Sequence, residues 1–412
     1  MNECLRAHAD AIVRGAIDRV MPGPAVRRAL EGRDFGPGRL VLVSVGKAGW
    51  SMAQAACGCL GERVDGGIVI TKHGHAQGPI GPLVIREAGH PVPDGDTFSA
   101  TAQALALTAD LTERDTVLFL LSGGGSALFE SPLVPQKELQ DVTRQLLASG
   151  ADIAEMNTIR KRLSGVKGGR FAQHCAPARV LAVVLSDIIG DPLDMIASGP
   201  AYPDSSTADD ARRITAQYGL DLSPQARSLL DLETPKALDN VETLVTGSVR
   251  ELCSAAADVC RELGYEPVVL TDCLCCEARE AGSFLASIAR SHQDSRRSLA
   301  FLAGGETVVH LTGKGLGGRN QELALAAAQG IAGCAGTAVF SVGSDGTDGP
   351  TDAAGGWVDD GTLAALSAQG LDLFQVLRDN DAYHALERTG GLIITGGTGT
   401  NVNDVAVVLI HR

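Results

Sequence analysis

Two glycine-rich segments in the first half of the chain have the residue types that bind anions. Val45–Gly49 contains Gly46 and Lys47, and it lies between a predicted strand and an alanine-rich helical stretch. A second segment follows another predicted strand and consists of Ser122, Gly123, Gly124, Gly125 and Ser126. Three consecutive glycines cost backbone entropy, which is commonly offset by a row of N–H groups around an anion. We therefore expect both segments to contact phosphate, although a tight turn with an exposed lysine would also explain the first.

Two aspartates follow the predicted strand Val180–Leu185, and they are the carboxylates placed best for chemistry. Asp187 comes directly after the strand and Asp191 precedes a proline. A carboxylate at a strand end can accept the proton of a hydroxyl group or hold Mg²⁺. We predict both roles for Asp187 and metal binding for Asp191, with a capping or turn aspartate as the alternative. The segment Ala197–Pro200 is expected to be structural.

A basic segment, Asn157–Arg170, carries five positive and no negative charges in a protein with a net charge of −14. On one continuous helix, Arg160 and Lys167 would share a face, as would Asn157 and Lys161. Arginine on such a face can clamp a carboxylate or phosphate through paired hydrogen bonds. We predict that Asn157, Arg160 and Lys161 bind a small acidic substrate. A solvated basic face is the alternative.

The C-terminal part contains further glycine-rich loops beside predicted strands and helices. Gly313–Arg319 leads into a strong helical pattern, with Gly318 and Arg319 at its end. Asp345 follows a predicted strand, and the loop Thr395–Asp404 precedes the last one. One loop of this sort is as consistent with a plain turn as with a binding site. Several in one chain predict a polyanionic ligand held between two domains.

The wider pattern is an alternation of short apolar runs with alanine-rich helical stretches. The expected strands are Leu40–Val45, Gly67–Thr71, Leu83–Glu87, Val117–Leu121, Val180–Leu185, Thr243–Thr246, Pro267–Leu270, Leu299–Ala303, Thr307–Thr312, Ala338–Val342, Leu392–Thr395 and Val405–Ile410. The expected helices include Gly49–Leu60, Thr97–Leu111, Pro135–Ser149 and Gln321–Gly330. Continuous apolar runs favour strands buried on both faces of parallel sheets, so the chain is predicted to be an α/β protein with doubly wound sheets.

The length of 412 residues favours two domains. The polar stretch Leu222–Asn240 is the expected connection, which divides the chain into 1–240 and 241–412. In doubly wound sheets, ligands bind beyond the carboxyl ends of the strands, where the strand order reverses. The loops that follow the strands are therefore where we expect the site.

Composition excludes several classes of partner. The negative net charge and an aromatic content of 4% argue against nucleic acid and anionic membranes. The ten cysteines lack the spacing of a disulfide framework, residues 1–20 lack a signal sequence, and no apolar run is long enough to span a membrane. We expect a soluble cytoplasmic protein with reduced thiols, and a homodimer is compatible with this composition.

Two weaker groups of residues are assigned no chemistry. His73, His75 and His90 lack a matching pattern of other metal ligands and are expected to be loop histidines. Cys273, Cys275 and Cys276 include one Cys-x-x-Cys spacing, but a zinc site normally needs a second pair.

Taken together, the motifs resemble the class II glycerate kinases, the glycerate 2-kinases with a C-terminal MOFRL domain. The resemblance covers nearly the whole chain, and each motif is weak alone. Its carriers are Val45–Ala48, Leu121–Leu128, Met156–Lys161, Leu163–Gly169, Leu185–Asp191, Gly304–Thr307, Gly317–Glu322 and Asp345–Gly349. One departure is Gly397, which stands where the family commonly has proline.

The resemblance implies that ATP and Mg²⁺ phosphorylate D-glycerate at its 2-hydroxyl in a cleft between the domains. It implies a Rossmann-like N-terminal domain and a smaller α/β MOFRL domain at the C-terminus. Lys47 and Arg319 would contact the phosphates, and Asp187 would lie at the reacting centre. Gly318 and Asp345 would belong to the nucleotide site, and Arg160 or Lys161 would hold the glycerate carboxylate.

Two alternatives remain open from the sequence. The first is an NAD(P)H-dependent hydroxypyruvate reductase, against which the absence of a dinucleotide fingerprint counts. The second is a sensor of sugar acids or nucleotides that binds without turnover. Titratable Asp187 and Asp345 at strand ends favour an enzyme over a sensor.

Overall fold

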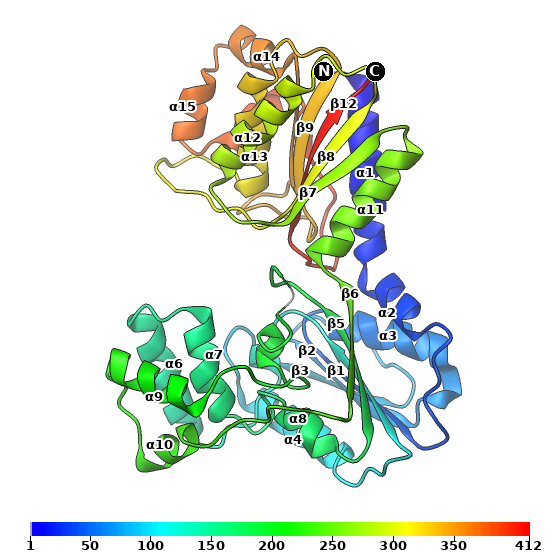
Figure 1. Ribbon diagram of the computed structural model, residues 1–412, viewed down its shortest axis with the longest axis vertical. Helices are drawn as coiled ribbons and strands as arrows, with labels where there is room; N and C mark the ends of the chain where they lie inside the picture. Colours follow the sequence, from blue (N-terminus) through cyan, green and yellow to red (C-terminus); the bar gives the residue numbers. More distant parts are fainter. Residues whose placement is uncertain (1, 191) are drawn as a thin grey trace. The chain divides into compact units, whose positions relative to one another are not determined.

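The computed structural model describes residues 2–190 and 192–412, so Asp191 lies outside the described residues. The chain divides into two compact units, one made of residues 25–246 and the other of residues 1–24 and 247–412. Each unit is built around its own six-stranded sheet. Figure 1 shows the two sheets and the helices that accompany each of them.

The unit of residues 25–246 contains a sheet in the order β3-β2-β1-β4-β5-β6. Its strands are β1 (Leu40–Val45), β2 (Gly66–Lys72), β3 (Leu83–Ala88), β4 (Thr116–Leu121), β5 (Arg179–Leu185) and β6 (Val241–Gly247). The pairs from β3 through β5 are all parallel. The strand order reverses between β1 and β4, which is the switch point of a doubly wound sheet. The predicted Rossmann-like fold is therefore confirmed for this unit.

Burial of both faces explains the apolar sequence of these strands. Every residue of β1 and β4 is buried. The helices that follow or precede the strands are α2 (Pro22–Leu30), α3 (Gly49–Leu60), α4 (Gly95–Leu107), α5 (Gly125–Leu128) and α8 (Arg170–Cys175), with 3₁₀ turns η1 (Gly61–Arg63) and η2 (Ile196–Ser198). Phe119, Phe129 and Phe171 meet in the core with ring centroids 4.9 to 6.0 Å apart.

Four more helices of this unit pack into a group beside the sheet (Figure 1). They are α6 (Gln136–Ala148), α7 (Ile153–Arg162), α9 (Ala208–Tyr218) and α10 (Pro224–Leu230). Their apolar faces share a core that includes Leu146, Ile159 and Ile214. Capping boxes at Asp152 and Thr207 fix the starts of α7 and α9.

The second unit has a mixed sheet in the order β11-β10-β9-β12-β8-β7. Its strands are β7 (Glu266–Leu274), β8 (Leu299–Gly305), β9 (Thr337–Gly343), β10 (Gly355–Asp359), β11 (Leu392–Ile393) and β12 (Asp404–Ile410). β7 and β8 are parallel, whereas β12 runs antiparallel to both β8 and β9, and β10 antiparallel to β9 and β11. The expectation of a parallel sheet was wrong here. β8, β9 and β12 are buried along their whole length. A strand buried on both faces has a continuous apolar sequence whether it runs parallel or antiparallel to its neighbours.

Helices cover the second sheet on both faces. They are α1 (Glu3–Val20), α11 (Val249–Glu262), α12 (Ala278–Ser291), α13 (Arg319–Gly330), α14 (Thr362–Ala368), α15 (Leu373–Arg378) and α16 (Ala382–Thr389). In Figure 1, α1 and α11 lie on one side of this sheet and α12 and α13 on the other.

The N-terminal helix explains why the compact units differ from the predicted division at residue 240. α1 packs against α11, and a Cβ on Gly15 would approach Val259 to 2.7 Å. This close packing places residues 1–24 with the C-terminal part, a pairing of distant segments that local composition does not reveal. The other boundary falls at residues 246 and 247, where β6 ends.

Several elements differ from the sequence-based expectation. Thr307–Thr312 is not a strand and only Val308 forms an isolated bridge, whereas β10 was not expected. The basic segment is not one helix, because α7 ends at Arg162 and α8 begins at Arg170. Gly168 and Gly169, with φ of 57° and 83°, turn the chain between the two helices.

No helix in the described part of the chain is both long enough and apolar enough to cross a membrane.

Candidate functional site

The candidate site of the unit of residues 25–246 lies at the carboxyl ends of β1, β4 and β5. Lys47 follows β1, the Ser122–Ser126 segment follows β4, and Asp187 follows β5. β1 and β4 are the neighbours between which the strand order reverses. The structure therefore brings these sequence-predicted residues to the switch point of the sheet, where doubly wound folds bind ligands.

The loop after β1 is closed against the loop after β4. The backbone N–H of Lys47 donates to the Gly123 carbonyl at 2.9 Å, and that of Ala48 to Ser122 Oγ at 3.1 Å. Gly46 has a φ of 124°, and a Cβ there would lie 2.2 Å from Ser122 Oγ. Glycine at 46 is therefore required by this close approach, and the first N–H groups before α3 already have acceptors inside the protein.

The loop after β4 has the opposite character. Ser122 is buried and its N–H donates to the Val45 carbonyl at 3.0 Å. Among the described residues, no acceptor is found for the N–H groups of the next four residues, Gly123 to Ser126. Gly124 adopts a left-handed conformation with φ of 86°. Successive N–H groups without acceptors form a concave site for an anion, since backbone donors are rarely left unpaired.

Lys47 and His90 lie over this loop. A Cβ on Gly124 would lie 3.3 Å from Lys47 Cγ and 3.0 Å from His90 Cδ2. The Lys47 side chain is exposed. Burial, followed by the charge of Lys47, lowers the pKa of His90 below its usual 6.5, so His90 is neutral at pH 7. His90 was expected to be an ordinary loop histidine, and no sequence signal ties it to a loop more than thirty residues away.

The Asp187 carboxylate also lies against this loop. A Cβ on Gly123 would come within 2.3 Å of Asp187 Oδ2. Gly123 is thus the residue that lets the carboxylate reach the glycine loop. Carboxylate oxygens suit Mg²⁺, which is commonly held in proteins by one or two carboxylates together with phosphate oxygens. The donor set at Asp187 therefore fits a magnesium ion, and Asp191, the other predicted metal ligand, lies outside the described residues.

A chain of polar side chains supports the end of the glycine loop. Ser126 Oγ lies 3.1 Å from Ser198 Oγ, which donates to Asn157 Oδ1 at 2.8 Å. Ala197 and Ser198 have φ of 50° and 61°, a conformation uncommon for residues other than glycine. Asn157, predicted to bind substrate, is buried and contacts Ser198 and Met195. The strained segment was expected to be only structural, and it holds Ser126 at the site.

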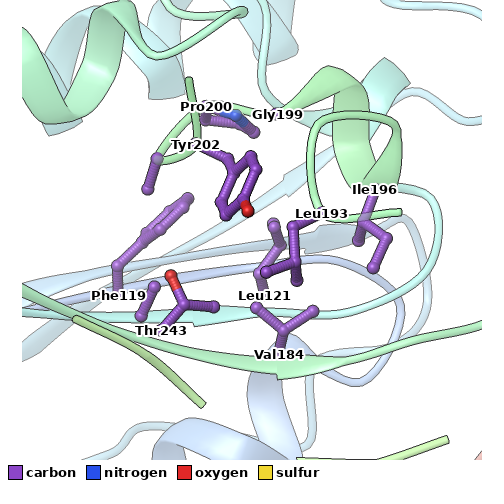
Figure 2. A pocket seen from close by; sticks show the side chains of 11 residues that line it. Phe119, Leu121, Val184, Leu193, Ile196, Gly199, Pro200, Tyr202 and Thr243 are labelled. Atoms are coloured by element: carbon purple, nitrogen blue, oxygen red, sulfur yellow. The ribbon is translucent and has the colours of Figure 1, made fainter. Parts of the chain in front are cut away.

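An apolar packing arrangement fixes this strained segment. Figure 2 shows Leu193, Ile196 and Tyr202 above Phe119 and Leu121 of β4. The cavity among these side chains is about 10 Å³, the room of one water molecule at most. It is a packing interface rather than a ligand site.

All five basic residues of Asn157–Arg170 make polar contacts within the protein. Lys161 is 1% exposed, and its Nζ lies 3.0 Å from Asp204 Oδ1 and 3.4 Å from Asp194 Oδ2. Arg162 is fully buried and pairs with Asp204 at 3.7 Å. Lys167 is held by Glu130, and Arg170 by backbone carbonyls. The prediction that Lys161 binds substrate stays a prediction, but its ammonium group is enclosed by carboxylates.

Arg160 is the remaining basic residue of the segment. It is half-buried, and its Nη2 donates to the Ser126 carbonyl at 3.3 Å. Lys167 Nζ donates to the same carbonyl at 2.9 Å. Burial lowers the pKa of both cations, that of Lys167 to about 8, and the charge of Glu130 opposes the shift. Arg160 therefore lies directly behind the glycine loop, and its predicted contact with a substrate carboxylate stays a prediction.

The second unit has its own cluster of charged residues at the start of α13. Arg319 Nε and Nη2 donate to the two Asp404 oxygens at 2.6 and 3.1 Å, and Nη1 lies 3.1 Å from Glu306 Oε1. Burial alone would lower the pKa of Arg319, but the hydrogen bonds and charges of these carboxylates raise that pKa above its usual value. Gly318 approaches Asp348 so closely that a Cβ would lie 2.2 Å from Asp348 Cγ. The guanidinium is therefore held rigidly, with its side chain 35% exposed.

Asp345 belongs to the adjoining turn. Its Oδ1 accepts the Thr347 N–H at 2.9 Å, and its carbonyl accepts the Thr398 N–H at 3.1 Å. The loop after β9 and the loop before β12, both predicted from the sequence to be ligand loops, are thus joined. Asn403, at φ of 64°, donates to Glu306 Oε2 at 3.3 Å.

Of the remaining histidines, His75 lies at the candidate site, with its Nδ1 3.2 Å from the Lys47 carbonyl oxygen. His73 Nε2 lies 2.9 Å from Asp94 Oδ2, and Asp94 and Asp96 together with His73 bring three metal-ligating atoms within 4.8 Å. Asp94 also caps α4, which accounts for its position. Cys273, Cys275 and Cys276 are exposed on and after β7.

Comparison with known proteins decides the family. Residues 8–231 match a domain of unknown function, DUF4147, and residues 299–404 match the MOFRL family. A D-glycerate 2-kinase of Thermotoga maritima is 51% identical, with 99% of each chain covered. The crystal structure of a glycerate kinase from the same organism superimposes with a TM-score of 0.94 at 51% identity, covering 99% of this chain and all of that one. The chain belongs to the class II glycerate kinase family.

Other similar proteins of the class II glycerate kinase family carry two kinds of name. A glycerate 2-kinase of Pyrococcus horikoshii is 37% identical and covers 92% of this chain and 90% of its own length. A protein of Agrobacterium vitis with a provisional hydroxypyruvate reductase name is 42% identical and covers 90% of this chain and all of its own. The kinase name belongs to the relative at 51% identity over the full length, and the hydroxypyruvate reductase name occurs at lower identity.

Proposed function

We propose that this class II glycerate kinase transfers the terminal phosphoryl group of ATP to the 2-hydroxyl of D-glycerate. One observation carries the proposal: four successive N–H groups, Gly123 to Ser126, lack acceptors among the described residues, and the Lys47 side chain lies over Gly124. Phosphoryl transfer needs positioning and charge stabilisation more than covalent chemistry. A row of backbone donors and one lysine supplies both.

The same geometry counts against a reductase that binds NAD(P)H at the first turn of the sheet. In dinucleotide-binding folds, the pyrophosphate lies on free N–H groups between β1 and the following helix. Here the N–H groups of Lys47, Ala48 and Gly49 donate to Gly123 O, Ser122 Oγ and Gly46 O. Donors that already have acceptors have no hydrogen bonds left for a pyrophosphate. The proposed anion site is therefore the loop after β4, not the first turn of the sheet.

Lys47 is proposed to neutralise charge on the transferred phosphoryl group. Its ammonium group is exposed on a backbone that two hydrogen bonds fix to the glycine loop. Neutral His90 beside it adds a ring donor without a second positive charge. The lysine therefore has the freedom to follow the phosphoryl group, and the histidine has the position to orient it.

Asp187 is proposed to receive the proton of the 2-hydroxyl and to contribute an oxygen to Mg²⁺. Mg²⁺, when bound with the nucleotide, neutralises charge on the phosphates. The carboxylate lies at Gly123, beside the first unpaired N–H groups of the loop. It is therefore near enough to the anion site to act on a hydroxyl group that attacks a phosphate there.

Arg319, Gly318 and Asp345 are proposed, from the resemblance to the family, to contribute to nucleotide binding. Asp404 and Glu306 hold Arg319 in a fixed orientation, which suits a residue that recognises phosphate by paired hydrogen bonds. We also propose that the protein is cytoplasmic and keeps its ten cysteines reduced, since all ten are unpaired.

The test measures cofactor and product in parallel. With ATP, Mg²⁺ and D-glycerate, the protein should consume glycerate and ATP in equal amounts. With hydroxypyruvate and NADH or NADPH, it should not oxidise the nicotinamide. Nicotinamide oxidation at a rate comparable with any kinase rate would favour the reductase, and tight glycerate binding without turnover of either kind would favour a sensor.

A further inference from the structure

A cavity of about 430 Å³ lies beside the candidate site, within the unit of residues 25–246. The segment Pro91–Phe98 forms one wall and α6 forms the other, with Glu130 and Arg160 also lining it. Neither Lys47 nor Asp187 lines it. Its volume is within the range of pockets that bind small molecules, and it far exceeds the size of glycerate.

Most of the lining is apolar. Val92 and Phe98 contribute from one wall, and Leu139 and Leu147 from the other. Val92 and Leu147 are 60% and 61% exposed and belong to one contiguous apolar lining, which is more informative than a single exposed apolar residue. A ligand with an apolar group would remove this surface from water.

Glu130 gives the cavity a buried carboxylate with unused acceptor capacity. The residue is 0% exposed, and neither of its side-chain oxygens has a hydrogen-bond partner among the described residues. Lys167 Nζ lies 3.0 Å from Oε2 and is its ion-pair partner, and it also donates to the carbonyls of Ser126 and Phe129. Among the described residues, Oε1 has neither a donor nor an ion-pair partner. A buried acceptor in that state is costly, so Oε1 favours a ligand that carries a hydroxyl group.

Arg160 gives the cavity a cation with unused donors. A guanidinium carries five N–H donors, and one hydrogen bond, from Nη2 to the Ser126 carbonyl, is found for Arg160 within the described ranges. The remaining donors suit a carboxylate. The cavity thus combines a cation that can bind a carboxylate, a carboxylate that can accept from a hydroxyl group, and an apolar wall.

We propose that this cavity is a second binding site, for an α-hydroxy acid that carries an apolar side chain. The ligand carboxylate would contact Arg160, its hydroxyl would donate to Glu130, and its side chain would lie between Val92 and Leu139. This goes beyond the proposed function, because the ligand is bound and not phosphorylated. It also uses the guanidinium that sequence analysis assigned to glycerate, and the experiment below separates the two assignments.

The probe is 3-phenyllactate, and the control ligand is 3-phenylpropionate, which lacks the hydroxyl group. Binding to the full chain is measured by calorimetry, with and without saturating D-glycerate. We expect 3-phenyllactate to bind at least about tenfold more tightly than 3-phenylpropionate, because the hydroxyl adds one hydrogen bond to a charged acceptor. We expect saturating glycerate to leave this affinity unchanged.

Two variants complete the test. Thr143→Phe fills the cavity from α6 and should abolish 3-phenyllactate binding, and Glu130→Gln should remove most of the preference for the hydroxyl. Thermal unfolding confirms that each variant is folded. If Glu130→Gln is unstable, Thr143→Phe alone still tests the proposal. The proposal is overturned by no binding to the parent protein, by competition with glycerate, or by unchanged binding to Thr143→Phe. Glycerate turnover by the parent protein, measured separately, reports on the proposed function and not on the cavity.

Discussion

The Asp187 carboxylate lies so close to Gly123 that a Cβ at residue 123 would stand 2.3 Å from Oδ2. Because glycine has a hydrogen atom where other residues have Cβ, the carboxylate after β5 can reach the loop after β4. Gly123→Ala should push the carboxylate away and lower kcat by about 100-fold, since a displacement near 1 Å at a reacting centre costs about that much. Steady-state kinetics check this.

Gly58→Ala is the matched control for Gly123→Ala. A Cβ on Gly58, inside α3, would meet no atom within 4 Å. The Gly58→Ala variant should therefore leave kcat unchanged and raise the free energy of unfolding by up to about 1 kcal/mol. Equal kinetics for the two alanine variants would show that the approach of Asp187 to Gly123 has no part in catalysis.

Lys47→Ala should lower kcat by about 100- to 1000-fold, the effect of removing one group that stabilises charge in a transition state. Within the described part of the chain, the exposed side chain makes no hydrogen bond or ion pair that the fold needs, so the unfolding temperature should hardly change. Lys137→Ala, an exposed lysine on α6, controls for the loss of one positive charge. Near-normal turnover by Lys47→Ala would remove Lys47 from the mechanism.

Lys161→Met should reduce stability rather than substrate affinity. Asp204 is 2% exposed, and removal of the ammonium group takes away one of its buried cationic partners. This should lower the free energy of unfolding by about 3 to 5 kcal/mol. Urea unfolding measures the loss, and Lys137→Met should change it by less than about 0.5 kcal/mol. An unchanged free energy of unfolding together with a raised KM for glycerate would instead support the substrate role predicted from the sequence.

Asp348 should make stability depend on pH in a defined direction. Burial raises its pKa from 3.8 to about 6, against hydrogen bonds from the N–H groups of Gln321 and Asn320. Between these values the folded protein binds more protons than the unfolded chain, so the stability that protonated Asp348 provides is present below about pH 4 and lost as the pH rises through about 6.

Asp348→Asn stays neutral and should escape this loss. Its free energy of unfolding relative to the parent protein should rise between pH 4 and pH 7, by up to about 3 kcal/mol. Urea unfolding at several pH values provides the measurement, and Asp18→Asn, an exposed aspartate of α1, corrects for the change in net charge. A difference that stays constant across this range would contradict the raised pKa.

Local sequence was sufficient to predict the loops and most strands. Glycines before a helix start and aspartates after a strand are local patterns, and Lys47, the Ser122–Ser126 segment and Asp187 indeed follow neighbouring strands. Strand direction in the second sheet was not predictable in this way. A strand buried on both faces, such as β12, has the same apolar sequence in a parallel or an antiparallel pair.

Partners distant in sequence account for most of what was missed. His90 reaches Gly124, and Ser198 reaches Ser126, through the tertiary fold alone. The charge of Lys161 suggested a substrate, but Asp204 lies 43 residues away in sequence, and no helical or strand period links the two. α1 joins the C-terminal unit for the same reason, because Val259 packs on Gly15.

The position of the new phosphate in the product tests the central claim most directly. The protein is incubated with ATP, Mg²⁺ and D-glycerate, and the coupling between phosphorus and the carbon-bound protons of the product is read by NMR. The account predicts that phosphorus couples to the single proton on carbon 2, which identifies 2-phosphoglycerate. Coupling to the two protons on carbon 3, or no phosphorylated product at all, would contradict it.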